Sequence, residues 1–473
     1  MESIDRLNQA ICYIEENLHD SVDYDEISRI TLSPISAFQR FFCLTTGMAL
    51  SEYIRRRKLS CAADDLLHTN EKIIDIAVKY GYISADAFSV AFKRTYNIPP
   101  SFARQSQIEL KPFYRLYFEL SIKYIKGDTK MKNIDNIRPL LDGMKGHNYG
   151  LPDCMKFILE CVGWGDKPDF WDIAAITGDT VAQVYNHNLT TSCEYCVSGY
   201  LAGSEHIKYV FDTLGYSHDY VTADQLNANT DFYIQIITGT IDMGIPVLVK
   251  TNLNDIPEWK SDVGTYCLIV GYDNGGQIIK LLFDGTETVD CVLTGKNKMD
   301  LIFIGKKRHE VSLERLYLNA IQKMTYWLTL PEHDGVYFGS EAFRAWADDI
   351  EAGHFADDDI PMWENYGVYV CNIATSGGES TYLFRKLADM NQSYSYLASL
   401  GEKIQKLLPA ESPIGGKSLL WMQLEELGGG MDMGEAKITM RNKEKRSKVA
   451  AALRDYAERL DRAVELLKEG LLV

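Results

Sequence analysis

Four consecutive basic residues, Arg55, Arg56, Arg57 and Lys58, are the first feature of this sequence that could do chemistry. Guanidinium and ammonium groups bind phosphate oxygens, and they supply much of a protein's affinity for nucleic acids. A run of charges also suits the solvated face of a helix. The sequence leaves both interpretations open for this run.

The acidic total charge of the chain would argue against a nucleic acid partner, so the distribution of charge along the chain has to be considered. The formal net charge is −17, but residues 1–108 hold 12 Lys and Arg against 14 Asp and Glu, a balance of −2. The remaining −15 falls on residues 109–473. In the first part many acids come early, between Glu15 and Glu26, whereas the basic run follows later. A local basic face is therefore compatible with the acidic total.

The N-terminus lacks a basic stretch followed by an apolar core, so we expect a cytoplasmic protein whose ten cysteines are reduced. Cys193 and Cys196 have a C-x-x-C spacing, but no second pair stands at the distance of a zinc site. We expect neither a metal nor a cofactor. The 473 residues suggest two to four domains, and no apolar run approaches the ~18–20 residues that cross a bilayer.

Helical spacing and capping signals predict six helices in the first hundred residues. Ser33-Pro34 is a favourable helix start, and Gly47, Gly81 and Asn97-Ile98-Pro99-Pro100 are breaks. The expected helices are residues 4–18, 23–30, 33–45, 50–67, 73–79 and 84–96. Two short helix-turn-helix units thus flank one helix about 30 Å long, close to the ~34 Å between major-groove faces on one side of a duplex.

This set of residues resembles the signature of the AraC/XylS family over about residues 5–105. The matching motifs are Phe38-Gln39-Arg40-Phe41-Phe42, Gly47, Ser51 to Leu59, Ile74-Asp75-Ile76-Ala77, Gly81-Tyr82, Ala91-Phe92-Lys93 and Pro99-Pro100-Ser101. The resemblance implies an all-α domain that binds double-stranded DNA through both units. The apolar positions are expected to form its core, namely Phe38, Phe41, Phe42, Ala77, Phe88 and Phe92.

The resemblance also places individual residues against DNA. In the first unit it puts Ser36, Gln39 and Arg40 on the bases, with Ala37 on the same face; Gln39 suits adenine, and Arg40 suits guanine or a phosphate. The matching positions of the second unit are Ala85, Asp86 and Val90, which include no cation and no amide. We therefore expect the first unit to read sequence, and the second to position the protein through Lys93 and Arg94 on phosphates or to read a thymine methyl through Val90.

The remaining residues have the mixed pattern of an α+β domain. We expect strands at 110–123, 232–238, 245–250, 266–273 and 278–283, the last two joined as a hairpin at Asn274-Gly275-Gly276, and helices at 152–162, 180–189, 204–215 and 443–469. The predicted fold is multi-domain: an all-α domain (1–108), a connector (109–143), and an α+β effector-sensing domain (144–473) that ends in a helix.

Residues 144–350 resemble the papain-like fold of bacteriocin-processing cysteine peptidases and of the butirosin-biosynthesis acyltransferase group. The resemblance puts Cys154 at the nucleophile position and Asp284 at that of the orienting acid. The base should be a histidine at 265–267, where this sequence has Thr265-Tyr266-Cys267. Neither Thr nor Tyr replaces imidazole as a base near pH 7, so we expect no enzyme activity. The alternative is a DNA-tethered acyltransferase or amide hydrolase that uses Cys154 with His147 or His187.

An inactive enzyme fold can retain a pocket for a small molecule. Aromatic side chains and the acidic balance of this part suit a cationic or aromatic effector. The candidate residues are Trp164, Trp171, Tyr185, Tyr195, Tyr200, Tyr266 and the acidic Asp357-Asp358-Asp359.

The apolar stripe of the last helix could pair two protomers or pack against its own domain; it consists of Leu453, Ala457, Leu460, Val464, Leu467 and Leu471. The sequence as a whole predicts a one-component transcription regulator controlled by a small molecule. We expect an activator, which would also have RNA polymerase as a partner, and a homodimer is an open alternative. A module that binds another protein is a third interpretation.

Overall fold

The structure is a computed structural model. It describes residues 2–106, 110–118, 131–141, 147–165, 167–188, 196–201, 203–256, 264–357, 359–373, 381–409 and 418–471. Among the described helices, none combines the length and the apolar character needed to span a membrane.

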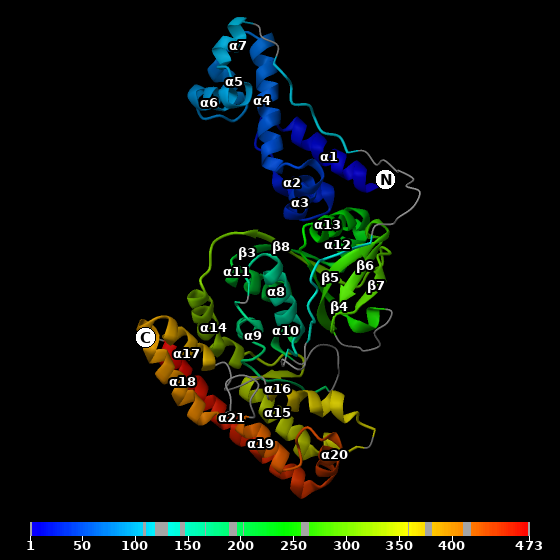
Figure 1. Ribbon diagram of the computed structural model, residues 1–473, viewed down its shortest axis with the longest axis vertical. Helices are drawn as coiled ribbons and strands as arrows, with labels where there is room; N and C mark the ends of the chain where they lie inside the picture. The colour runs from blue at the N-terminus through cyan, green and yellow to red at the C-terminus, as the bar shows by residue number, and fades with distance from the viewer. Residues whose placement is uncertain are drawn as a thin grey trace.

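The N-terminal region is helical, and the six predicted helices are confirmed within two residues at each end. Its helices are α1 (Glu2–Glu16), α2 (Tyr24–Thr31), α3 (Ile35–Thr46), α4 (Leu50–His68), α5 (Ile73–Lys79), α6 (Ala85–Tyr96) and α7 (Pro100–Ser106). The N-cap residue of α3 is Pro34 rather than Ser33, and Gly47, whose φ of 69° suits glycine, is the C-cap residue. Figure 1 shows the long α4 joining the two units.

The second unit has a hydrophobic core of its own, made by α4, α5, α6 and α7. Ala77, Phe88 and Phe92 are fully buried in it, as predicted. The first unit is different, because its buried side chains continue into the C-terminal domain. Phe38, Phe41 and Phe42 belong to one apolar cluster with residues of α13 and of the central sheet.

The C-terminal domain is built on an antiparallel sheet with the strand order β3-β8-β4-β5-β6-β7, and β1 pairs with β5. The strands are β1 (Lys132–Asn133), β3 (Tyr216–Val221), β4 (Val247–Asn252), β5 (Gly264–Asp273), β6 (Ile278–Leu282), β7 (Thr288–Val292) and β8 (Asp300–Lys307). The predicted β5–β6 hairpin at Asn274–Gly276 is confirmed. A separate two-stranded sheet pairs β2 (Val184–Asn186) with β9 (Val336–Phe338).

Helices cover both faces of the central sheet. Side chains of β4 and β5 alternate: Val249 and Ile269 join the apolar cluster that contains α13, whereas Leu248 and Leu268 join the cluster that contains α8. The domain's helices are α8 (Gly150–Cys161), α9 (Phe170–Thr177), α10 (Val197–Tyr200), α11 (Ser204–Thr213), α12 (Ala223–Ala228), α13 (Thr230–Asp242), α14 (Leu313–Leu328), α15 (Gly339–Ala352), α16 (Val368–Ile373), α17 (Tyr382–Met390), α18 (Ser395–Leu407), α19 (Leu419–Glu426), α20 (Met433–Arg441) and α21 (Lys443–Leu471).

Three predicted elements are wrong. Residues 232–238 lie in α13, because the apolar residues around them recur at helical spacing on one buried face. Residues 180–189 contain β2 instead of a helix, since Val184–Asn186 pairs with β9. Of the strand predicted at 110–123, residues 110–118 belong to no helix or strand, and residues 119–123 lie outside the described residues. The segment 110–118 contacts the first unit, where the backbone of Phe118 exchanges two hydrogen bonds with the Asn8 side chain.

The final helix α21 packs inside its own domain. Leu453, Ala457, Leu460, Val464 and Leu467 are buried, and the helix makes its most extensive contacts with α15. Of the two alternatives that the sequence left open for this stripe, the structure has the intramolecular one.

Candidate nucleic-acid interface

The first recognition helix, α3, is docked on the C-terminal domain through the face that should meet DNA. Arg40 donates hydrogen bonds from Nη2 to the Asp219 carboxylate of β3 at 3.2 Å and to the Ile304 carbonyl of β8 at 2.8 Å. Its guanidinium also lies over the Phe303 ring, 5.2 Å from the centroid. The Arg40 side chain is 14% exposed and that of Asp219 6%. This pair is therefore almost fully removed from water.

The electrostatics of this pair follow from its burial. Burial lowers the pKa of Arg40, and the neighbouring Asp219 carboxylate opposes that effect. Arginine titrates so far above neutrality that it stays charged. If Asp219 were removed, the buried positive charge of Arg40 would have no compensating negative charge, which is costly. The docked arrangement of the two domains therefore depends on this pair.

Apolar contacts surround the ion pair. Phe41 lies 4.9 Å from Phe232 of α13, measured between ring centroids. Leu44 packs on Gly239 of the same helix so closely that a Cβ added at Gly239 would come within 2.7 Å of Leu44 Cδ1. Ala37, Arg40, Phe41 and Leu44 have the i, i+3, i+4, i+7 spacing of one helix face. Figure 1 shows α3 lying against α13.

The docked face overlaps the predicted DNA-reading face. Ala37 and Arg40 belong to both, and Ser36 and Gln39, beside them on α3, are partly buried. A helix in a major groove needs these side chains exposed to base edges. If α3 reads bases through these side chains, as the family resemblance predicts, it has to leave this docked arrangement to do so.

The second recognition helix, α6, is exposed. Ser84 caps its N-terminus by accepting a hydrogen bond from the Ala87 N–H. Asp86, Val90, Lys93 and Arg94 are exposed and Ala85 is partly buried, whereas Phe88 and Phe92 on the opposite face are buried. The structure therefore presents the predicted contact residues of this unit on one outer surface.

The basic run divides into two pairs with different surroundings. Arg55 and Arg56 are partly exposed and both bind Glu52, whose pKa their hydrogen bonds lower to about 2. Arg57 instead binds Glu15 of α1 and the Phe113 carbonyl, and Lys58 donates to the Asp20 carbonyl. Arg55 and Arg56 remain the candidates for phosphate contact, whereas Arg57 and Lys58 hold α4 to its neighbours.

The candidate catalytic residues of the C-terminal domain do not form one exposed site. Cys154 is buried in α8, whereas Asp284 is exposed after β6. Thr265 and Tyr266, where a histidine was expected, are buried in β5.

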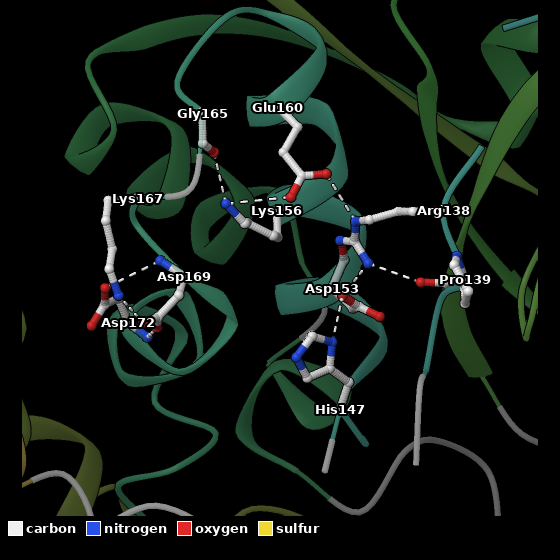
Figure 2. A network of polar contacts seen from close by, with 10 residues as sticks. All are labelled: Arg138, Pro139, His147, Asp153, Lys156, Glu160, Gly165, Lys167, Asp169 and Asp172. Carbon is white, nitrogen blue, oxygen red and sulfur yellow. Dashed lines mark hydrogen bonds and ion pairs between the residues drawn. The ribbon is translucent and has the colours of Figure 1, made fainter. Parts of the chain in front are cut away.

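A polar network that sequence reasoning missed lies beside Cys154, and Figure 2 shows its members. His147 Nδ1 lies 3.2 Å from Asp153 Oδ1, and the ring stacks on Phe170 with 4.2 Å between centroids. Arg138 bridges Asp153 and Glu160. Burial acts to raise the pKa of Asp153, but His147 and Arg138 together lower it. His147 is therefore engaged with a carboxylate of its own.

The aromatic residues proposed for an effector pocket belong mainly to the core. Trp171, Tyr185 and Tyr266 are buried in the main apolar cluster, with Trp164 and Tyr200 packed against it. Trp164 donates from Nε1 to the Tyr216 hydroxyl at 2.8 Å. Tyr195, Cys193 and Asp358 lie outside the described residues, while Asp357 caps a turn by accepting from the Asp359 N–H.

Comparisons with known proteins find relatives of the N-terminal part. The family model "Helix-turn-helix domain" matches residues 28–106. The HTH-type transcriptional activator AarP of Providencia stuartii is 38% identical over 100 residues, which cover 21% of this chain and 74% of AarP. The regulatory protein SoxS of Escherichia coli K12 is 33% identical over 95 residues, which cover 20% of this chain and 89% of SoxS.

Two further matches cover similar shares of the chain, 20% and 22%. The HTH-type transcriptional regulator YbfP of Bacillus subtilis is 37% identical over 94 residues, and the chain spans only 32% of that regulator's length. The match to a crystal structure of a transcriptional regulator with an AraC-type DNA-binding domain, from Chromobacterium violaceum, covers 22% of this chain and 92% of that chain at 24% identity, with a TM-score of 0.21.

The fold places this chain in the class of proteins whose N-terminal domain contains two helix-turn-helix units. With the similarity to AarP and SoxS, the chain belongs to the AraC family of transcription regulators. The papain-like resemblance of the C-terminal domain stays a prediction; what the structure has there is an antiparallel sheet covered by helices.

Proposed function

We propose that this protein is a DNA-binding transcription regulator whose C-terminal domain controls the first helix-turn-helix unit by covering its recognition helix. The observation that carries the proposal is the buried Arg40–Asp219 ion pair, which joins a predicted base-reading side chain to the sheet of the C-terminal domain. In this arrangement only the second unit has its recognition surface exposed. The described conformation is then the one with weak DNA affinity.

Release of the first unit requires a signal that favours the undocked arrangement. An effector shifts such an equilibrium only by its difference in affinity between the two states. We propose a small molecule, cationic or aromatic, bound by the C-terminal domain, and we propose activation as the outcome. The acidic balance of residues 109–473 supports the first point, and the similarity to an activator supports the second.

The proposal is tested by selecting DNA from a random-sequence pool with the full chain and measuring its affinity by fluorescence anisotropy. We expect saturable, sequence-dependent binding that strengthens when an effector is added. A library of cationic and aromatic compounds is screened beforehand by thermal unfolding, since a ligand of the native state raises its melting temperature. Affinity that depends on salt but not on sequence would contradict the proposal.

We further propose that the domain does not catalyse thiol chemistry. The burial of Cys154 and the engagement of His147 by Asp153 support this, because a nucleophilic thiolate needs a base and access to substrate. A thiol-reactive probe tests it on the full chain. Stoichiometric labelling of Cys154, prevented by a substrate analogue, would favour the alternative of a DNA-tethered acyltransferase or amide hydrolase.

A further inference from the structure

Three potential metal ligands meet on one side of the C-terminal domain, in a place that neither the sequence motifs nor the regulator function accounts for. His187 directly follows β2, Asp349 lies near the end of α15, and His354 begins the short helix η4 (His354–Ala356). One donor atom of each of the three residues lies within 4.8 Å of the other two. Residues far apart in the sequence are thus brought together by the β2–β9 pairing and the end of α15.

The geometry is centred on one carboxylate. His187 Nδ1 lies 2.8 Å from Asp349 Oδ2, and His354 Nδ1 lies 3.0 Å from Asp349 Oδ1. The two imidazole rings are 5.8 Å apart between centroids and are inclined by 48°. Around a tetrahedral zinc ion with bonds of about 2.0–2.1 Å, donor atoms are about 3.3 Å apart. Shifts of well under 2 Å would therefore admit an ion among these atoms.

The carboxylate of this cluster is buried, whereas the two imidazoles are accessible to solvent. The Asp349 side chain is 5% exposed, whereas those of His187 and His354 are 49% and 42% exposed. Among the described residues, Asp349 forms ion pairs with these two histidines. Histidine carries a charge only when it is protonated. A divalent cation would compensate the buried carboxylate and would still be reached from solvent.

A fourth residue orients the carboxylate. Tyr185 of β2 is fully buried and donates its hydroxyl to Asp349 Oδ2 at 2.6 Å. Hydrogen bonds of this kind to a ligating carboxylate fix its direction and raise metal affinity. Tyr185, which the sequence suggested as part of an aromatic pocket, is thus a positioning residue here.

We propose that His187, Asp349 and His354 bind a divalent first-row transition ion, with zinc as the ion best matched to two imidazoles, one carboxylate and an open fourth position. The ion would tie the β2–β9 sheet to the end of α15 and to η4. The proposal departs from the expectation that the chain holds no metal, and it concerns residues other than Cys193 and Cys196. It stands independently of DNA binding.

The test uses the full chain, stripped with a chelator that is then removed, and titrated with Co²⁺ and Zn²⁺ in separate experiments. Calorimetry gives stoichiometry and affinity, and the visible absorption of bound Co²⁺ distinguishes nitrogen and oxygen ligands from thiolates. The variants are His187→Ala and His354→Ala, whose half-exposed positions should tolerate truncation, and Tyr185→Phe. His333→Ala is the matched control, because His333 is an exposed histidine beside β9 and outside the cluster.

We expect one ion per wild-type chain without thiolate absorption. Each ligand histidine variant should lose at least about tenfold in affinity, Tyr185→Phe about tenfold, and His333→Ala nothing. Thermal unfolding in excess chelator shows whether each variant is folded. The absence of saturable binding, a Co²⁺ spectrum with thiolate absorption, or wild-type affinity in both histidine variants would overturn the proposal.

Discussion

Replacement of Asp219 by Asn should raise the affinity of the full chain for its DNA. The change removes the charge that binds the buried Arg40 and keeps the side-chain shape, while the bond from Arg40 to the Ile304 carbonyl is retained. Arg40 itself is intact, so its role on DNA is not disturbed. The variant therefore weakens docking alone.

The magnitude follows from the burial of the pair. Hydrogen bonds to charged groups contribute about 1.5–3 kcal/mol to stability, and this pair is 14% and 6% exposed. A loss of about 2 kcal/mol from the docked state alone changes the ratio of docked to undocked molecules about 30-fold. Apparent DNA affinity scales with the fraction of competent molecules, so the gain approaches about 30-fold where the docked state dominates.

The assay is fluorescence anisotropy with the selected DNA at fixed salt, for wild type, Asp219→Asn and Asp212→Asn. Asp212 is the control because it is a partly exposed carboxylate of α11 that binds Lys208 and Arg308. Its replacement makes the same change in net charge at a carboxylate whose ion pairs are with Lys208 and Arg308 instead of Arg40. If both variants gain equally in affinity, the cause is the charge and the docking argument is refuted.

Further expectations concern the docking contact, the second unit and acid stability. Gly239→Val should raise DNA affinity severalfold, because its side chain would meet Leu44 Cδ1; unchanged affinity in a folded variant would argue against the contact. Arg94→Ala should weaken binding evenly across DNA sequences and reduce the salt slope by about 1, whereas Arg40→Ala should relax sequence preference; sequence-blind losses from both would contradict the division of roles. His206 is buried beside Lys323, and burial first and that charge second lower its pKa to about 4. Because the folded state resists protonation, the unfolding free energy should fall by about 3 kcal/mol as the pH drops from about 6.5 to 4, and His206→Gln should flatten this part of the curve measured in urea. A variant with the wild-type slope would show that other groups cause the acid loss.

The sequence was informative wherever local signals agree with one another. Capping residues and breaks such as Gly47 and Gly81 fixed the N-terminal helices, because a short helix with strong ends depends little on distant contacts. The β5–β6 hairpin followed from its Asn-Gly-Gly turn for the same reason. The strand predicted at 232–238 failed because isoleucines with high β propensity form the buried face of α13, where packing outweighs propensity.

The candidate site was only half predictable. Sequence reasoning identified Arg40 and Gln39 from the family signature, but nothing local points to Asp219, 179 residues away from Arg40. The same holds for the cluster of His187, Asp349 and His354, which exists only because β2 pairs with β9 and α15 follows. Pairings over such separations leave no trace in a single sequence.

The covering of α3 has a consequence for how the protein would respond to its own abundance. The competing surface is part of the same chain, so DNA must compete with a tethered partner whose effective concentration is set by the connector and does not fall on dilution. Making more protein would raise the number of undocked molecules without changing their fraction. Occupancy of the DNA targets would then rise with abundance only in proportion to the undocked fraction, and the effector would set that fraction.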